Sequence, residues 1–155
     1  MRLATMTDYA LRLLMYLAQH PGRLCTIAEA ARAHGISEAH LMKVTHHLGL
    51  LGWIETVRGK GGGMRLARAP RDIGLGEVVR DMEPDFHLVE CFSSGNTCVL
   101  TGRCALTGVL QSALQDFLAR LDGVTLADIV PSAPLSAAAA PRRVTVRRAT
   151  TRQGV

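Results

Sequence analysis

Three closely spaced cysteines carry the clearest chemistry in the sequence. Cys91, Cys98 and Cys104 fall within 14 residues, separated by six and then five residues, in a polar, glycine-containing segment. Cysteines at this density in an intracellular protein indicate a metal or a cluster. Structural zinc sites use cysteines two to four residues apart. The longer spacing here favours an iron–sulfur cluster, because its thiolates surround a larger object.

Other uses of these cysteines remain open from spacing alone. They are a zinc site, a thiol switch, inert thiols, contacts to a partner protein in a cluster-free DNA-binding module, and a thiol-disulfide redox enzyme. The sequence has no C-x-x-C motif and no βαβ pattern, and this disfavours the redox enzyme. The fourth cysteine, Cys25, lies between apolar neighbours just before a helix cap, so we expect a buried structural thiol.

The first half of the chain predicts a helix-turn-helix. A first helix is expected to begin at Thr7 or Asp8 and to stop at the Pro21-Gly22 pair. The run Thr26-Ile27-Ala28-Glu29 is a capping box that opens a second helix, which ends at His34-Gly35. Ser37 can cap a third helix, whose apolar residues are Leu41, Val44 and Leu48. Two short helices joined by a tight glycine turn are typical of this motif.

A β-hairpin is expected after the third helix. Residues 53–57 and 64–68 each have the composition of a strand, and the segment between them is basic and rich in glycine. A hairpin with such a tip is the expected form of a wing. The predicted fold class is therefore mainly α with a small β-hairpin, a winged helix-turn-helix domain followed by a long dimerisation helix.

The polar residues of this unit form a candidate DNA-binding surface. A helix fits the major groove, and hydroxyl, lysine and imidazole groups can bond phosphates or base edges. A solvated helix face and an ordinary hairpin are the plainer explanation of the same pattern. The DNA-binding candidates are Ser37, His40, Lys43, Thr45, His46 and His47 on the third helix and Arg58, Lys60 and Arg65 on the wing.

The second half predicts a dimerisation helix. After a short helix over 73–82 and a polar loop over 83–102, Thr101 can cap a long helix that reaches about Leu121. This start would place Cys104 in the first turn, where the helix dipole favours a thiolate. Apolar residues recur every three or four positions along the helix, and a two-fold partner would cover them. A last short helix follows a capping box at Thr125.

Charge divides the chain into three segments. Residues 1–70 carry nine basic and four acidic residues, and residues 71–130 carry four basic and nine acidic residues. Residues 131–155 hold five arginines and no acid. We therefore predict a DNA-binding domain over 1–70, a cysteine loop and dimerisation helix over 71–130, and a disordered basic tail over 131–155.

The sequence predicts a protein of the cytoplasm. Arg12 interrupts the first apolar run, and no stretch of 18 or more apolar residues occurs, so a membrane span is not expected. Polar residues and an acid stand where the apolar core of a signal peptide would be. In the reducing cytoplasm the cysteines stay available as thiols.

Several motifs together resemble the NsrR/IscR-type family of winged-helix iron–sulfur repressors. The resemblance covers residues 1 to about 130. It is carried by Met1-Arg2-Leu3, Thr7-Asp8-Tyr9-Ala10-Leu11-Arg12, Val57-Arg58-Gly59-Lys60-Gly61-Gly62, Ile73-Gly74-Leu75-Gly76-Glu77-Val78-Val79-Arg80, the cysteine loop and Thr125-Leu126-Ala127-Asp128-Ile129. IscR-like members carry a further histidine ligand three residues after the third cysteine, where this chain has Thr107.

The resemblance implies a cofactor, a partner and a signal. They are a [4Fe-4S] cluster held by Cys91, Cys98 and Cys104 of one subunit and Asp8 of the other, with a [2Fe-2S] redox or cluster-status sensor as the alternative. It further implies a homodimer that represses from a double-stranded DNA operator and responds to nitric oxide. By itself Asp8 would rather cap the first helix or pair with Arg12 at the i+4 position.

Overall fold

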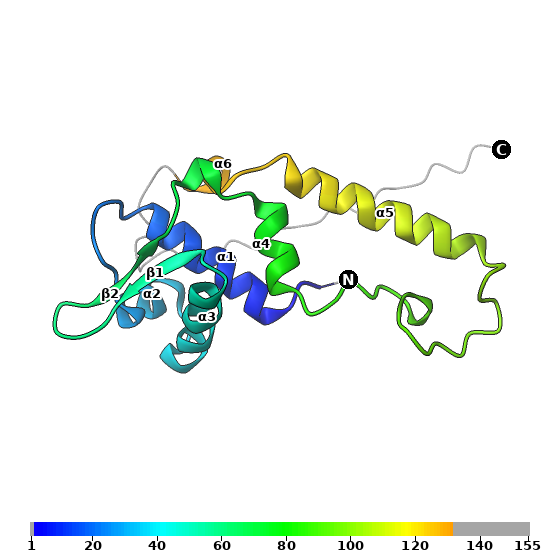
Figure 1. The fold of residues 1–155 in the computed structure, drawn as a ribbon, viewed down its shortest axis with the longest axis horizontal. Helices are drawn as coiled ribbons and strands as arrows, with labels where there is room; N and C mark the ends of the chain where they lie inside the picture. The colour runs from blue at the N-terminus through cyan, green and yellow to red at the C-terminus, as the bar shows by residue number, and fades with distance from the viewer. Residues whose placement is uncertain (1, 132–155) are drawn as a thin grey trace, which may run out of the picture.

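The computed structural model describes residues 2–131, and the predicted basic tail beyond residue 131 lies outside this range. The fold is mainly helical with one two-stranded hairpin, which confirms the expected class (Figure 1). In chain order the elements are α1 (Thr5–Ala18), α2 (Ile27–His34), α3 (Glu38–Leu50), β1 (Ile54–Val57), β2 (Gly63–Leu66), η1 (Pro70–Asp72), α4 (Leu75–Met82), η2 (Glu90–Phe92), α5 (Ala105–Asp122) and α6 (Leu126–Ile129).

Local sequence signals set the helix-turn-helix. The Thr26 hydroxyl accepts from the N–H of Glu29, and the Glu29 carboxylate accepts from the N–H of Thr26, so the predicted capping box is confirmed. Gly35 ends α2 in the left-handed conformation, at φ 63°. Ser37 then caps α3 by accepting from the N–H of His40 at 3.3 Å.

Two glycines allow close backbone approach in the wing, one within the hairpin and one against the segment before α2. β1 pairs with β2 in antiparallel register, with Ile54 opposite Leu66. A Cβ at Gly62 would lie 2.2 Å from the carbonyl oxygen of Val57, and one at Gly63 would lie 2.7 Å from that of Cys25. Cys25 forms a β-bridge with Met64 and is 1% exposed, which confirms the expected buried thiol.

One hydrophobic core serves both halves of the chain. It contains Leu13, Leu41 and Leu48 from the helix-turn-helix, and it continues into α4 and α6. The fully buried residues in this part of the chain are Ile73 shortly before α4, Val78 and Val79 of α4, and Leu126 of α6. The change of charge at residue 70 therefore does not separate two cores.

α5 extends away from this core. No residue of α5 is buried, and Leu106 and Val109 are 59% and 64% exposed. Figure 1 shows the cysteine loop at the end of α5 that points away from the helix-turn-helix. The other end is fixed to α4 by Arg80, which donates two hydrogen bonds to the carboxylate of Asp122. Gly76 leaves room for this pair, because a Cβ there would overlap the Asp122 carboxylate.

Two predicted helix starts are wrong. α1 begins at Thr5 because its N-cap residue, Ala4, donates its N–H to the carboxylate of Glu83 at 2.8 Å, and the side chain of Thr7 is fully buried. α5 begins at Ala105, not after Thr101. Gly102 lies in between at φ 79°, a left-handed conformation that cannot belong to an α-helix.

Candidate functional site

The exposed face of α3 carries most of the predicted DNA-binding residues. Leu41, Val44 and Leu48 are fully buried, and they orient the opposite face of the helix toward solvent. Five predicted residues are exposed at the start and along this face, namely Ser37, His40, Lys43, His46 and His47. The structure therefore leaves these five accessible on the solvent side of α3 and its cap.

Thr45 does not belong to this surface. It is 7% exposed, and its hydroxyl donates to the sulfur of Met64 in β2 at 3.5 Å. The helical period places position 45 beside the buried Leu41 and Leu48, and the hairpin covers it. Its burial contradicts the prediction that it contacts DNA.

One exposed residue of α3 was missed. Met42 is 59% exposed and lies one helical turn before His46 on the solvent face. A polarity-based prediction passes over it because methionine usually counts as a core residue. Its place in the helical period, away from the residues that are buried, is the signal that finds it.

The three basic residues of the wing are exposed but differ in their partners. Arg65 lies opposite Glu55 in the hairpin, and its guanidinium contacts that carboxylate at 2.7 and 2.8 Å. Arg58 and Lys60 stand at the glycine-rich tip. The tip therefore offers charge for phosphates directly, whereas Arg65 has to share its charge with Glu55.

The cysteine loop holds three free thiols. Cys91 lies in η2, Cys98 in a turn and Cys104 at the N-cap of α5, and each is partly exposed. Within residues 2–131, no three His, Cys, Asp or Glu side chains are close enough together to hold a single metal ion.

Hydrogen bonds to Thr107 connect two of these thiols. The Cys91 sulfur lies 3.5 Å from the Thr107 hydroxyl. The side chain of Cys104 makes no capping hydrogen bond to α5. Its sulfur still interacts with the N–H and hydroxyl of Thr107 and with the N–H of Leu106, and these donors lower the pKa of Cys104. The first turn of α5 thus favours the thiolate, as the helix dipole argument predicts, although Cys104 lies just before the turn and not within it.

A second contact connects Cys91 to Cys98. Glu90, the residue before Cys91, accepts hydrogen bonds from the N–H and hydroxyl of Thr97, the residue before Cys98, at 3.0 and 2.9 Å. These bonds lower the pKa of Glu90 and close the loop on itself. The donor set therefore suits soft thiolate ligation: three accessible sulfurs whose segments are held together by short polar contacts.

Asp8 lies on α1, away from the cysteines of its own chain. Arg12 contacts both carboxylate oxygens of Asp8, at 3.0 and 2.8 Å, which confirms the local pairing expected from the i+4 spacing. The alternative of a helix cap is wrong, because Ala4 is the N-cap of α1. Next to Asp8, the ring of Tyr9 lies 6.1 Å from the ring of His40 on α3.

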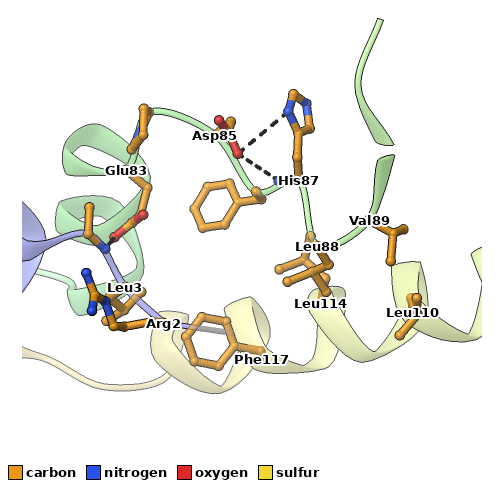
Figure 2. A pocket seen from close by; sticks show the side chains of 13 residues that line it. Arg2, Leu3, Glu83, Asp85, His87, Leu88, Val89, Leu110, Leu114 and Phe117 are labelled. Atoms are coloured by element: carbon orange, nitrogen blue, oxygen red, sulfur yellow. Dashed lines mark hydrogen bonds and ion pairs between the residues drawn. The ribbon is translucent and has the colours of Figure 1, made fainter. Parts of the chain in front are cut away.

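An apolar hollow of about 560 Å³ separates the start of the cysteine loop from α5. Figure 2 shows Leu110, Leu114 and Phe117 of α5 facing it, with Leu88 above and Leu3 at the side. Polar groups stand at its border, where Asp85 contacts the ring and the N–H of His87. The hollow leaves much of the apolar face of α5 uncovered within one chain.

Comparison with known proteins identifies the family. The model of Rrf2, described as an iron-dependent transcriptional regulator, matches residues 3–132. The chain belongs to the Rrf2 family. Among curated relatives, the HTH-type transcriptional regulator NsrR of Bacillus subtilis (strain 168) is 51% identical over 132 residues, 84% of this chain and 90% of the relative. The NsrR of Shouchella clausii is 48% identical over the same length.

Solved Rrf2-type structures have the same fold. T. potens IscR is 28% identical, with a TM-score of 0.67 over 83% of this chain and 85% of that chain. The global cysteine regulator CymR of B. subtilis is 23% identical with a TM-score of 0.68, which supports the fold alone. Both curated relatives are named as transcriptional regulators. No helix within residues 2–131 has the length and hydrophobicity to cross a bilayer.

Proposed function

We propose that this Rrf2 protein is a cytoplasmic, homodimeric repressor that binds operator DNA with a [4Fe-4S] cluster bound and releases the DNA in response to nitric oxide. One observation carries the proposal. The segments that carry the three thiols are joined by hydrogen bonds near the outer end of α5, while Asp8 lies on α1 next to Tyr9, whose ring contacts that of His40 on α3. A cluster held by the cysteines and by Asp8 would connect the cysteine loop of one subunit to the reading head of the other, that is, to its α3 and wing.

The residues fit such a cluster. Cys91, Cys98 and Cys104 would hold it through thiolates, and Asp8 of the other subunit would supply an oxygen ligand, which is harder and more exchangeable than a thiolate. When bound, the cluster supplies iron that reacts with nitric oxide. Arg12 contacts both oxygens of Asp8, so ligation of Asp8 has to share or replace one of these contacts.

α1 can pass a change at Asp8 to the DNA. Leu13 and Leu14 of α1 are fully buried in the same core as Leu41 and Leu48 of α3. Tyr9 contacts His40 at the start of α3. A small rotation of α1 would therefore move α3. The two α3 helices of a symmetric dimer have to match DNA half-sites about one helical turn apart, so such a movement would weaken operator binding.

The uncovered face of α5 supports the homodimer. Its apolar residues line an open hollow, and no residue of the helix is buried within one chain. A second copy packed on this face would bury Leu106 and Val109, and it would also bring a second α1 toward the cysteine loop. The same contact would then complete both the dimer and the ligand set.

The operator would meet α3 and the wing tip. Lys43 and the histidines of α3 would contact phosphates and base edges, and Arg58 and Lys60 would contact the backbone beside them. Exposure of Lys43, Arg58 and Lys60 supports this. Met42 adds an apolar group to the same face, suited to a thymine methyl. Two such heads in a symmetric dimer read a palindromic site.

A mixed dimer tests whether the site is shared. Asp8→Ala and Cys98→Ala chains with different tags are co-expressed, and dimers carrying both tags are purified without oxygen. If the ligands come from both subunits, the mixed dimer has one complete site, and its visible absorption survives a chelator as long as that of the wild type. If it decays as fast as in the Asp8→Ala homodimer, the shared site is wrong. Arg12→Gln is the control for loss of the ion pair alone.

A further inference from the structure

Thr107 touches two of the three proposed cysteine ligands. Its hydroxyl lies 3.5 Å from the sulfur of Cys91, and its hydroxyl and backbone N–H both act on the sulfur of Cys104. Cys91 and Cys104 are 13 positions apart, in a short 3-10 helix and at a helix end. A single side chain thus brings together two segments that the chain itself does not join.

The position of Thr107 suits this task. It is the third residue of α5, an 18-residue helix, so its backbone is held more firmly than that of the loop. η2, which carries Cys91, has three residues and no buried side chain. A donor on the rigid element therefore fixes a sulfur on the less constrained one, while the Glu90–Thr97 contact fixes Cys98 relative to Cys91.

We propose that Thr107 is a positioning residue of the cysteine site: its hydroxyl holds Cys91 beside Cys104 at the start of α5 and donates to their sulfurs when these act as ligands. The inference deepens the proposed function and rests on it. The hydroxyl has one proton and two sulfurs within its reach, so it can donate to either one. The Thr107 N–H acts on the Cys104 sulfur as well.

Hydrogen bonds to ligand sulfurs matter for metal retention. They delocalise the negative charge of the thiolate and fix its direction, and loss of such outer contacts typically costs about 10–100-fold in metal affinity. For iron–sulfur clusters they also shift the reduction potential. Removal of the Thr107 hydroxyl should therefore weaken cluster retention without removing a ligand.

The test compares Thr107→Val, which has nearly the same shape without the hydroxyl, with Thr107→Ser, which keeps the hydroxyl. The full-length dimer is purified without oxygen, and loss of its visible absorption is followed in excess iron chelator. We expect Thr107→Val to lose the cluster about tenfold faster or more and Thr107→Ser to behave as the wild type. Equal rates in all three proteins would overturn the proposal. Equal defects in both variants would also overturn it, because they would assign the effect to packing.

A second measurement does not depend on the cluster. A short bis-alkylating reagent is added to the metal-free chain, and mass spectrometry measures the share of chains cross-linked between Cys91 and Cys104. We expect a high share in wild type and Thr107→Ser and a several-fold lower share in Thr107→Val. An unchanged share in Thr107→Val would contradict the positioning role. A wild-type chain that takes up no iron and sulfide would refute the proposed function, while the cross-linking result would still decide the role of Thr107.

Discussion

At the scale of single residues, side-chain direction matters more than residue type. Lys43 and Thr45 are two positions apart on α3, and both can bond DNA, but only Lys43 points to solvent. Asp8 likewise has a role set by its neighbours: both of its oxygens contact Arg12 one turn along α1. In both cases the packing of the helix against the core decides which atoms a partner can reach.

Replacement of Lys43 by alanine should weaken operator binding and reduce its salt dependence. A phosphate contact of this kind releases about one counterion, so the slope of log K against log salt should become less steep by about one. Arg71→Ala is the matched control, because Arg71 is exposed outside the reading head. Fluorescence anisotropy at several salt concentrations measures both. An unchanged slope in Lys43→Ala would remove Lys43 from the DNA interface.

Local patterns predicted these residues well only where neighbours in sequence decide the outcome. The Asp8–Arg12 pair follows from i+4 spacing, and it is present. The burial of Thr45 depends on Met64, 19 residues away, which no local pattern contains. The hydroxyl of Thr107 beside Cys91 is also a tertiary contact, and for that reason the sequence alone did not reveal its role.

At the scale of elements, capping boxes were predictable and one long helix start was not. The boxes at Thr26 and Thr125 are both present, because each needs only two side chains three residues apart. The start of α5 lies three residues after the predicted one, since Thr101 bonds Asn96 and the carbonyl of Cys98 in a turn instead. The left-handed conformation of Gly102 prevents an earlier helix start, and the φ of a glycine cannot be predicted from its residue type.

The wing depends on a glycine with no room for a side chain. A Cβ at Gly62 would lie 2.2 Å from the Val57 carbonyl oxygen, so Gly62→Ala has to displace the tip. We expect operator affinity to fall about tenfold, or about 1.4 kcal/mol, with the helical circular dichroism intact. Gly49→Ala in α3 is the control, because a Cβ there meets nothing within 4 Å. A Gly62→Ala chain with wild-type affinity would show that the tip geometry does not serve DNA binding.

The link between α4 and α5 predicts a dependence of stability on pH. Two hydrogen bonds from Arg80 hold the pKa of Asp122 below its usual range. A carboxyl group with a lowered pKa stabilises the fold at pH values above its ordinary pKa of about 3.9. This stabilisation is lost as the pH falls through the native pKa. Asp122→Asn should therefore lower the melting temperature slightly at neutral pH and by less at pH about 3.

A double-mutant cycle separates this pair from other acid effects. In an Arg80→Gln background, Asp122→Asn should change the melting temperature little at either pH, because the pair is already broken. Thermal melts by circular dichroism measure all four proteins. A full Asp122→Asn effect in the Arg80→Gln background would show that Asp122 acts through another partner.

At the scale of the whole molecule, segments of opposite net charge share one hydrophobic core. The net charge of +5 is the sum of a basic front, an acidic middle and a basic end. The basic front carries α3 and the wing, and the acidic middle carries the cysteine loop and α5. α4 and α6 pack into the same core as α1 and α3. Under the proposed function, a shift of α5 would therefore be passed to α3 through this core.

The central claim is that the cysteine site controls DNA binding in response to nitric oxide. The anaerobic, coloured dimer is titrated with nitric oxide while operator binding and visible absorption are followed together, with Cys98→Ala in parallel. We expect wild-type operator affinity to fall in step with the loss of the cluster absorption, and we expect no response in Cys98→Ala. Tight operator binding that persists in the wild type after the absorption has gone, or a full nitric oxide response in Cys98→Ala, would contradict it.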